Sequence, residues 1–161
     1  MPLEIERKFL LKRVPISEDG DENYDIIQFY CSDKTEDFRV RRTVFPDRKE
    51  IYYKTVKKFI SSGVNEELEG EITKEEFFKY LCTTDVEGKI SKIRTVRKYG
   101  DLKWEIDKFP FGLVVAEIEL PSIDFPLNLP EYITKELIME VTSFREFGNK
   151  NLAEKCFGSW I

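Results

Sequence analysis

The sequence predicts an α+β protein, in which about eight antiparallel strands form a sheet that can close into a barrel and a few helices pack outside it. Two observations predict this fold. Apolar and polar residues alternate with a period of two along most of the chain, and helical spacing is confined to short segments. Turn residues separate the alternating runs. A chain of 161 residues without a linker or repeat is expected to be a single domain, residues 1–161.

The first half of the chain is expected to be mostly strand. A polar loop, "SEDGDEN", separates the first two alternating runs. Pro46 and Asp47 mark a later turn, and the loop "ISSGVN" precedes the last run of this half. The predicted strands are residues 2–12, 24–32, 36–45, 49–57 and 66–72.

The second half is expected to mix helices with strands. Thr73 is suited to cap the first helix, and Pro130 is suited to begin the second. A short C-terminal helix is expected to bury Leu152 and Cys156. The predicted helices are residues 73–81, 129–137 and 149–157, and the predicted strands are residues 89–100, 102–109 and 112–120, the first two of these joined by a hairpin turn at Gly100-Asp101.

The composition excludes several classes of function. Charged residues make up 35% of the chain but leave a net charge of only -5, so no basic patch predicts a nucleic-acid partner. No apolar run reaches transmembrane length, and the N-terminus lacks a signal-peptide apolar region. The cysteines are odd in number and scattered, which suits reduced thiols. We therefore expect a cytoplasmic protein without a membrane partner, and the sequence leaves a homodimer open.

Histidine is absent from the chain. Its absence removes Ser-His-Asp and Cys-His catalysis and metal sites that contain histidine. Any chemistry must therefore use carboxylates, Lys, Arg, Tyr, or a metal held by oxygen.

Charged residues recur on one face of the predicted strands. In "LEIERKFL", Glu4, Glu6 and Lys8 share one face, with Ile5 and Phe9 on the other. Most of the later groups carry a single sign. The later groups are Arg39 with Arg41, Glu67 with Glu69 and Glu71, Lys92 with Arg94, Glu117 with Glu119, and the one mixed group, Lys103 with Glu105 and Asp107.

Two interpretations fit these charged faces. They are solvated outer faces of a half-buried sheet, or they point inward and line a wide barrel. Surface charges are usually interspersed in sign, whereas these are segregated by strand, which favours the second interpretation. Buried charges must be paired or bind ions. Carboxylates suit hard divalent cations such as Mg²⁺, and Arg and Lys suit phosphate oxygens, so the pattern predicts a polyphosphate ligand with a metal.

The motifs resemble those of the CYTH superfamily, also called triphosphate tunnel metalloenzymes. "EIERK" is similar to the Glu-x-Glu-x-Lys signature of that family near the N-terminus. The motifs "QFYC", "RVR", "TVK", "ELE", "KIR", "WEID" and "EIE" follow in the family's order along nearly the whole chain. The resemblance implies an eight-stranded antiparallel closed tunnel with a charged interior and helices outside.

The resemblance also implies roles for individual residues. Carboxylates would hold Mg²⁺ or Mn²⁺, with one metal on the phosphates and a second near the attacking water. Lys92 and Tyr30 are candidates to orient or deprotonate that water, and Lys57 is favoured over Lys54 as the inward lysine. The implied metal ligands are Glu4, Glu6, Glu117 and Glu119, completed by Glu67, Glu69, Glu105 and Asp107. The implied triphosphate ligands are Lys8, Arg39, Arg41, Lys57, Lys92 and Arg94, and Lys8, Tyr30, Lys92 and Arg94 are the catalytic candidates.

Three functions are consistent with such a tunnel. The short chain without an obvious insertion for a base or thiazolium ring resembles small bacterial tripolyphosphatases, which implies hydrolysis of inorganic tripolyphosphate to diphosphate and phosphate. The same tunnel could serve an adenylate cyclase or a nucleoside or thiamine triphosphatase. A polyphosphate-binding module without catalysis is the third hypothesis.

Overall fold

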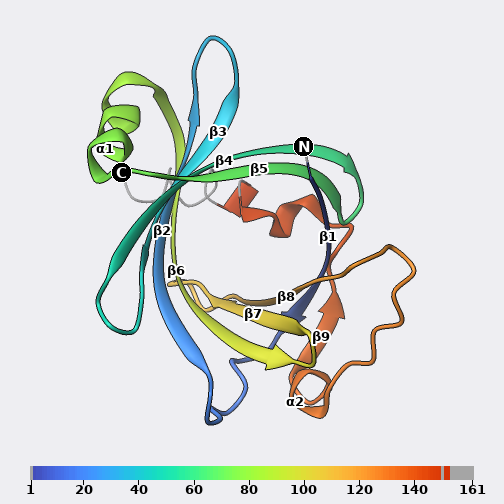
Figure 1. The fold of residues 1–161 in the computed structure, drawn as a ribbon. Helices are drawn as coiled ribbons and strands as arrows, with labels where there is room; N and C mark the ends of the chain where they lie inside the picture. The colour runs from blue at the N-terminus through green and yellow to red at the C-terminus, as the bar shows by residue number, and fades with distance from the viewer. Residues whose placement is uncertain (1, 150, 153–161) are drawn as a thin grey trace.

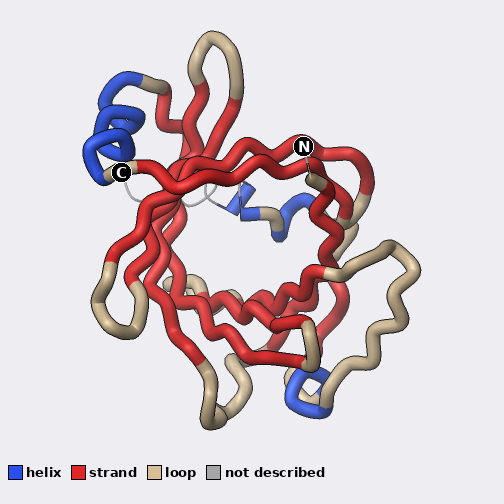
Figure 2. Tube along the Cα trace, in the orientation of Figure 1, coloured by secondary structure: helices blue, strands red, loops and turns tan. Residues whose placement is uncertain are grey.

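A computed structural model describes residues 2–149 and 151–152, and its strands curve into a closed antiparallel barrel (Figure 1). Figure 2 shows that strands make up most of the barrel wall and that α1 and α2 lie outside it. The predicted fold class is therefore confirmed. The strands are β1 (Leu3–Leu11), β2 (Glu22–Ser32), β3 (Asp37–Val44), β4 (Glu50–Ser61), β5 (Val64–Ile72), β6 (Asp85–Tyr99), β7 (Leu102–Lys108), β8 (Val114–Glu119) and β9 (Leu137–Glu140).

The barrel closes where β1 meets β5. The strand order is β5-β4-β3-β2-β6-β7-β8-β1-β9, and β1 also pairs with β5 at residues 3–5. Beyond this pairing, the Glu6 N–H donates to the carbonyl of Gly63 at 2.8 Å. Gly63 has a φ of 74°, and a Cβ there would lie 2.6 Å from the carbonyl oxygen of Glu6. Only glycine fits this backbone and this close approach, so the β4–β5 turn can pack directly on β1.

Strand β9 was not predicted. The sequence predicts a helix over 129–137, but α2 covers only Glu131–Thr134, and Leu137–Glu140 then pairs with residues 9–11 of β1. The partner of β9 is the part of the β1 edge that β5 does not reach. This pairing joins segments more than 120 residues apart, so local helical spacing does not reveal it.

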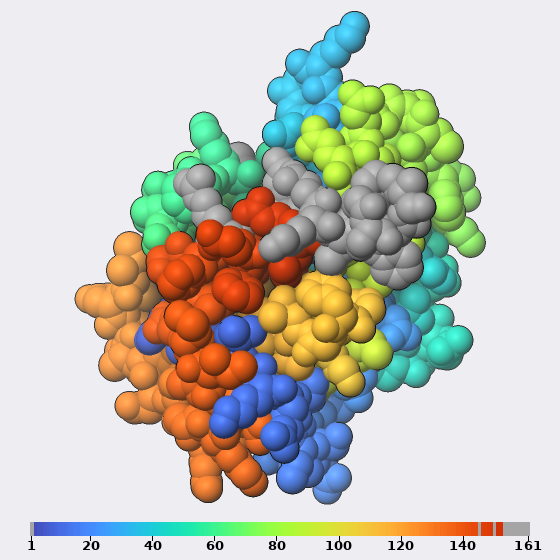
Figure 3. Space-filling view, turned by 180° about the vertical axis from the view of Figure 1, so that it is seen from behind, coloured from blue at the N-terminus to red at the C-terminus, as the bar shows by residue number. Residues whose placement is uncertain are grey.

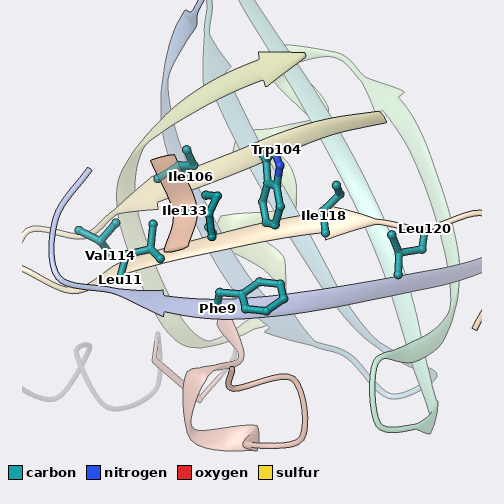
Figure 4. Packing of buried hydrophobic residues seen from close by; sticks show 9 residues of the cluster. Phe9, Leu11, Trp104, Ile106, Val114, Ile118, Leu120 and Ile133 are labelled. Carbon is teal, nitrogen blue, oxygen red and sulfur yellow. The ribbon is translucent and has the colours of Figure 1, made fainter. Parts of the chain in front are cut away.

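The apolar faces of the strands point outward, beneath the helices. Phe9, Trp104 and Ile118 pack with Ile133 of α2 outside β1, β7 and β8 (Figure 4). On the other side, α1 (Lys74–Thr83) covers the barrel with Phe77. Thr73 caps α1, as predicted, and forms a capping box with Glu76. No helix in the described part of the chain is long and apolar enough to cross a membrane.

The segment after β9 lies across one end of the barrel. Figure 3, the view from behind, shows atoms of this segment in red across the middle of that end of the molecule. Within the barrel, Leu152 is buried against Ile90, Phe109 and Val115, as expected for its predicted burial. Residues 149 and 151–152 are helical, whereas residue 150 and the rest of the predicted helix, including Cys156, lie outside the described residues.

Candidate active site

The barrel interior is lined by charged side chains from most of its strands. Because β-strands alternate, the faces opposite the outer apolar clusters carry the charged groups identified from the sequence. Of the two candidate lysines on β4, Lys57 contacts Glu4 across the interior, whereas Lys54 lies outside over the rings of Phe38 and Tyr80. The charged faces of the strands therefore point into the barrel.

Three carboxylates gather around Lys57 near the β1–β5 seam. The Lys57 ammonium lies 2.8 Å from Glu4, 3.7 Å from Glu67 and 4.0 Å from Glu6. Burial, and then a hydrogen bond with Glu67, raise the pKa of Glu4 to about 7 against the charge of Lys57. One lysine thus serves several acids, and the cluster retains an excess of negative charge.

A second mixed cluster surrounds Lys8 on the same strand. Its ammonium lies 3.5 Å from Glu6 and 3.6 Å from Glu117. Burial and the charge of Glu117 raise the pKa of Glu6 to about 7. Burial also opposes ionisation of Glu117, but the charges of Lys8 and of two more distant cations outweigh it and lower its pKa to about 2. Glu117 is therefore the carboxylate of this pair that stays ionised.

The backbone that carries Glu6 and Lys8 is held from outside the barrel. The Lys8 N–H donates to the hydroxyl of Thr142 at 2.9 Å, and the Val141 N–H donates to the Lys8 carbonyl at 2.8 Å. Together with the bond from Glu6 to Gly63, these contacts satisfy the edge of β1 where no strand pairs with it. The two side chains thus project from a fixed backbone.

Arg39 and Arg41 form a basic wall on β3. The Nη2 atom of Arg41 lies 3.2 Å from Glu69, and that of Arg39 lies 3.4 Å from the Thr55 hydroxyl. Arg41 also stacks over Tyr53. The Nε atoms of both arginines are buried, and no described residue accepts a hydrogen bond from them. Two buried guanidinium donors without an acceptor are suited to bind an anion.

The remaining inward cations are tied to carboxylates of β7. Arg94 binds Asp107 through Nε at 2.8 Å and Nη2 at 3.0 Å, and its Nη1 binds Glu105 at 2.8 Å. Lys92 binds Asp107 at 2.7 Å, and both side chains are 1% exposed. Burial and the charge of Arg94 lower the pKa of Lys92 to about 8, although Asp107 favours its charged form. Asp107 already has three strong cationic hydrogen bonds, which distinguishes it from the carboxylates near Lys57.

A cavity of about 460 Å³ opens into this charged interior. Lys8, Arg39 and Lys57 line it together with Tyr30 and Asn149. Lys92 does not line it, because its ammonium lies 3.3 Å behind the side-chain oxygen of Asn149. The structure therefore places Tyr30, but not Lys92, in the cavity wall.

Two polar residues of the interior were not predicted as site residues. Gln28 is fully buried and donates from Nε2 to the Tyr30 hydroxyl at 3.1 Å. Asn149 contacts Lys92 from the C-terminal segment. Gln28 stands within "QFYC" and Asn149 within "GNKNLA", but uncharged residues do not stand out in a pattern of charges.

The carboxylates do not converge on a single point in this structure. Among the described residues, no group of three or more Cys, Asp or Glu side chains is gathered closely enough to hold a metal ion. Lys57 and Lys8 lie between the acids instead. The donor set still fits a hard cation, because several oxygens of Glu4, Glu6 and Glu67 share one lysine and Glu67 has a buried oxygen without a hydrogen bond to a described residue.

Comparison with known proteins identifies the family. No model of a known protein family matches the chain. The chain is 36% identical over 129 residues to the inorganic triphosphatase of Acetivibrio thermocellus, a match that covers 76% of this chain and 74% of that protein. It also resembles the crystal structure of the inorganic triphosphatase NE1496, with 25% identity, a TM-score of 0.57, and coverage of 93% of this chain and 97% of that one. The PH1012 protein from Pyrococcus horikoshii OT3, at 22% identity and a TM-score of 0.53 over 75% of this chain and 80% of that one, shares the fold.

The fold and the site define a class of protein, the closed antiparallel barrels with carboxylates and basic side chains facing a central tunnel. The match to the inorganic triphosphatase of Acetivibrio thermocellus shows the family. The chain belongs to the CYTH superfamily, the triphosphate tunnel metalloenzymes, in which it aligns with an inorganic triphosphatase.

Proposed function

We propose that this protein hydrolyses inorganic tripolyphosphate to diphosphate and phosphate inside the barrel, with the help of a divalent cation. The observation that supports this most directly is the pair of buried Nε donors on Arg39 and Arg41, which face the interior without an acceptor among the described residues. They face the same interior as Glu4 and Glu67, two carboxylates that both depend on Lys57 for a positive charge. A wall for phosphate oxygens opposite a wall for a cation is the arrangement that phosphoryl transfer requires.

The basic side chains bind and orient the phosphate chain. Arg39 and Arg41 present planar guanidinium groups that match phosphate oxygens. Lys8 and Lys57 are now held by carboxylates at 2.8 to 3.6 Å, and a phosphate chain offers them competing anions. When the ammonium groups turn to phosphate, the carboxylates around them lose their partners and their affinity for another cation rises.

Glu4, Glu6, Glu67, Glu117 and Glu119 would hold the cation. Glu119 pairs in register with Glu6, and its pKa is raised by burial and by the charge of Glu4, as expected for a crowded acidic group. Mg²⁺ or Mn²⁺ bound by these oxygens would supply charge neutralisation for the phosphates. Glu105 and Asp107 serve a different purpose in this proposal, because their bonds to Arg94 hold its guanidinium in place.

Tyr30 is the best-placed side chain to contact the attacking water. Its ring lines the cavity beside Arg39, and Gln28 donates to its hydroxyl at 3.1 Å, which leaves the phenolic proton available to donate. Lys92 lies behind Asn149 and acts from the second layer of the site. Tyr30 therefore orients water or a phosphate oxygen, and Lys92 fixes the groups around it.

Substrate profiling tests the proposed reaction. Purified protein with Mg²⁺ or Mn²⁺ is expected to hydrolyse tripolyphosphate with a kcat/KM at least about tenfold above its values for ATP and thiamine triphosphate. The measurement is release of phosphate, with diphosphate identified as the second product. Preference for ATP, formation of cyclic AMP, or binding of tripolyphosphate without turnover would each replace the proposal with one of the other hypotheses.

The rate is expected to rise from acid pH to an alkaline optimum. Glu4 and Glu6 have pKa values of about 7, so both are protonated at low pH and are then poor ligands for a cation. Lys92, with a pKa of about 8, keeps its proton, and with it the bond to Asn149, until the pH enters the alkaline range. A profile of kcat/KM against pH at saturating cation measures this. A maximum near pH 5 would contradict it.

A further inference from the structure

The segment that follows β9 brings one uncharged side chain into the charged cavity. Asn149 lines the cavity together with Lys8, Arg39 and Lys57. Its position is fixed by the turn that carries it, because the Leu152 N–H donates to the Gly148 carbonyl at 3.0 Å and the Leu152 side chain is buried in the apolar cluster at the barrel end. Asn149 thus reaches the interior from a segment that is anchored on both sides.

The contact with Lys92 determines which way the carboxamide faces. The Lys92 ammonium lies 3.3 Å from Oδ1 of Asn149 and 2.7 Å from Asp107. An ammonium can only donate, so the carbonyl oxygen of the amide must face it. The NH₂ group therefore lies on the opposite arm of the amide, turned away from Lys92.

We propose that Asn149 is a substrate-binding residue, in which Lys92 fixes the carboxamide and the NH₂ group donates to a phosphate oxygen of the triphosphate held by Lys8, Arg39 and Lys57. The inference rests on the proposed function, since it names a further contact in the same site. It also gives buried Lys92 a purpose. Lys92 does not line the cavity, and it acts on the substrate by holding the amide group of Asn149, which does line it.

Asn149→Asp separates substrate binding from a structural role. Aspartate keeps the shape of the side chain and an oxygen toward Lys92, but it replaces the NH₂ donor with a negatively charged acceptor. The expected result is a KM for tripolyphosphate that rises about tenfold to a hundredfold, the range for loss of one hydrogen bond to a charged group. Asn149→Leu, which removes both contacts, is expected to raise KM about tenfold. Thermal melting of Asn149→Asp should stay within a few degrees of the parent.

Asn151→Asp is the control for added charge, because it places the same charge on the same segment and in the same cavity. It measures the effect of charge alone, which we expect to be about threefold in KM. If Asn149→Asp keeps the parent KM, or if Asn151→Asp raises KM as much as Asn149→Asp does, the proposed contact is wrong.

Equilibrium calorimetry with tripolyphosphate keeps this inference distinct from the proposed reaction. In the presence of a chelator, where no turnover is expected, Asn149→Asp should weaken the Kd for tripolyphosphate about tenfold or more relative to Asn151→Asp. If the parent protein binds tripolyphosphate but hydrolyses none, the proposed reaction fails and this comparison of Kd values still decides the role of Asn149. Equal Kd values, or no binding to the parent protein, overturn the inference.

Discussion

Chelation of divalent cations is expected to lower kcat/KM for tripolyphosphate at least about a hundredfold, and Glu4→Gln is expected to do the same at cation concentrations that saturate the parent protein. Glu4 lies in the acidic cluster 2.8 Å from Lys57, which in turn lies 3.7 Å from Glu67. Glutamine keeps the shape but loses the charge that attracts a hard cation. Activity that persists after thorough chelation would remove the basis for a cation at these carboxylates.

Glu4→Gln is expected to keep its fold, because the charge of Glu4 opposes folding at the assay pH. Burial raises its pKa from 4.5 to about 7. A carboxyl with a raised pKa in the folded state costs stability once the pH exceeds its unfolded value, and the full cost is present above pH 7. Removal of the charge should therefore leave the melting temperature at pH 8 unchanged or higher. A large loss of stability would show that the pairing with Lys57 outweighs the cost of burial.

Glu66→Gln is a matched control for this variant. Glu66 precedes Glu67 on β5, and strand alternation places it on the outer face of the barrel, in register with Leu3. It should keep parent activity and parent affinity for Mn²⁺, both measured beside Glu4→Gln by kinetics and calorimetry. Equal loss of Mn²⁺ affinity in both variants would indicate a general effect of net charge.

The inward and outward faces of the strands could be predicted because they depend on a period of two that each segment carries by itself. Leu3, Ile5 and Phe9 alternate with Glu4 and Glu6, and no distant partner is needed to read that pattern. The choice of Lys57 over Lys54 came from the resemblance of "TVK" to the family motif, and the structure places the two lysines on opposite faces.

The pairing of charges could not be predicted, because it depends on how the strands are staggered around the barrel. The sequence shows that β7 offers carboxylates and β6 offers cations, but not that Asp107 receives both Lys92 and Arg94. Strand β9 escaped prediction for a related reason. It pairs with residues 9–11 of β1, an edge that is available because β5 pairs only with residues 3–5. The position of Asn149 could not be predicted for both reasons. The segment that carries it follows β9, and its side chain contacts the Lys92 that is paired with Asp107.

Arg39→Ala and Arg41→Ala are each expected to lower kcat/KM for tripolyphosphate tenfold to a thousandfold, whereas Arg42→Ala should stay within a few fold of the parent. Arg39 and Arg41 face the interior, and their buried Nε atoms lack an acceptor among the described residues. Phosphate oxygens that gain charge as the bond breaks would supply that acceptor. Loss of either guanidinium therefore removes a charged contact to the transition state.

Arg42 is the matched control that the chain itself provides, since it follows Arg41 on the same strand and carries the same side chain. It faces outward, where it pairs with Glu50 beside Tyr52, and its side chain is 39% exposed. An ion pair of that exposure contributes little to stability, so its removal should disturb neither the fold nor the interior. Steady-state kinetics of the three single variants, with melting temperatures as a check on folding, provide the measurement. If Arg42→Ala is as damaging to kcat/KM as the other two while its melting temperature is unchanged, then the inner face of β3 is not where the phosphates bind, and the assignment of Arg39 and Arg41 to the substrate is wrong.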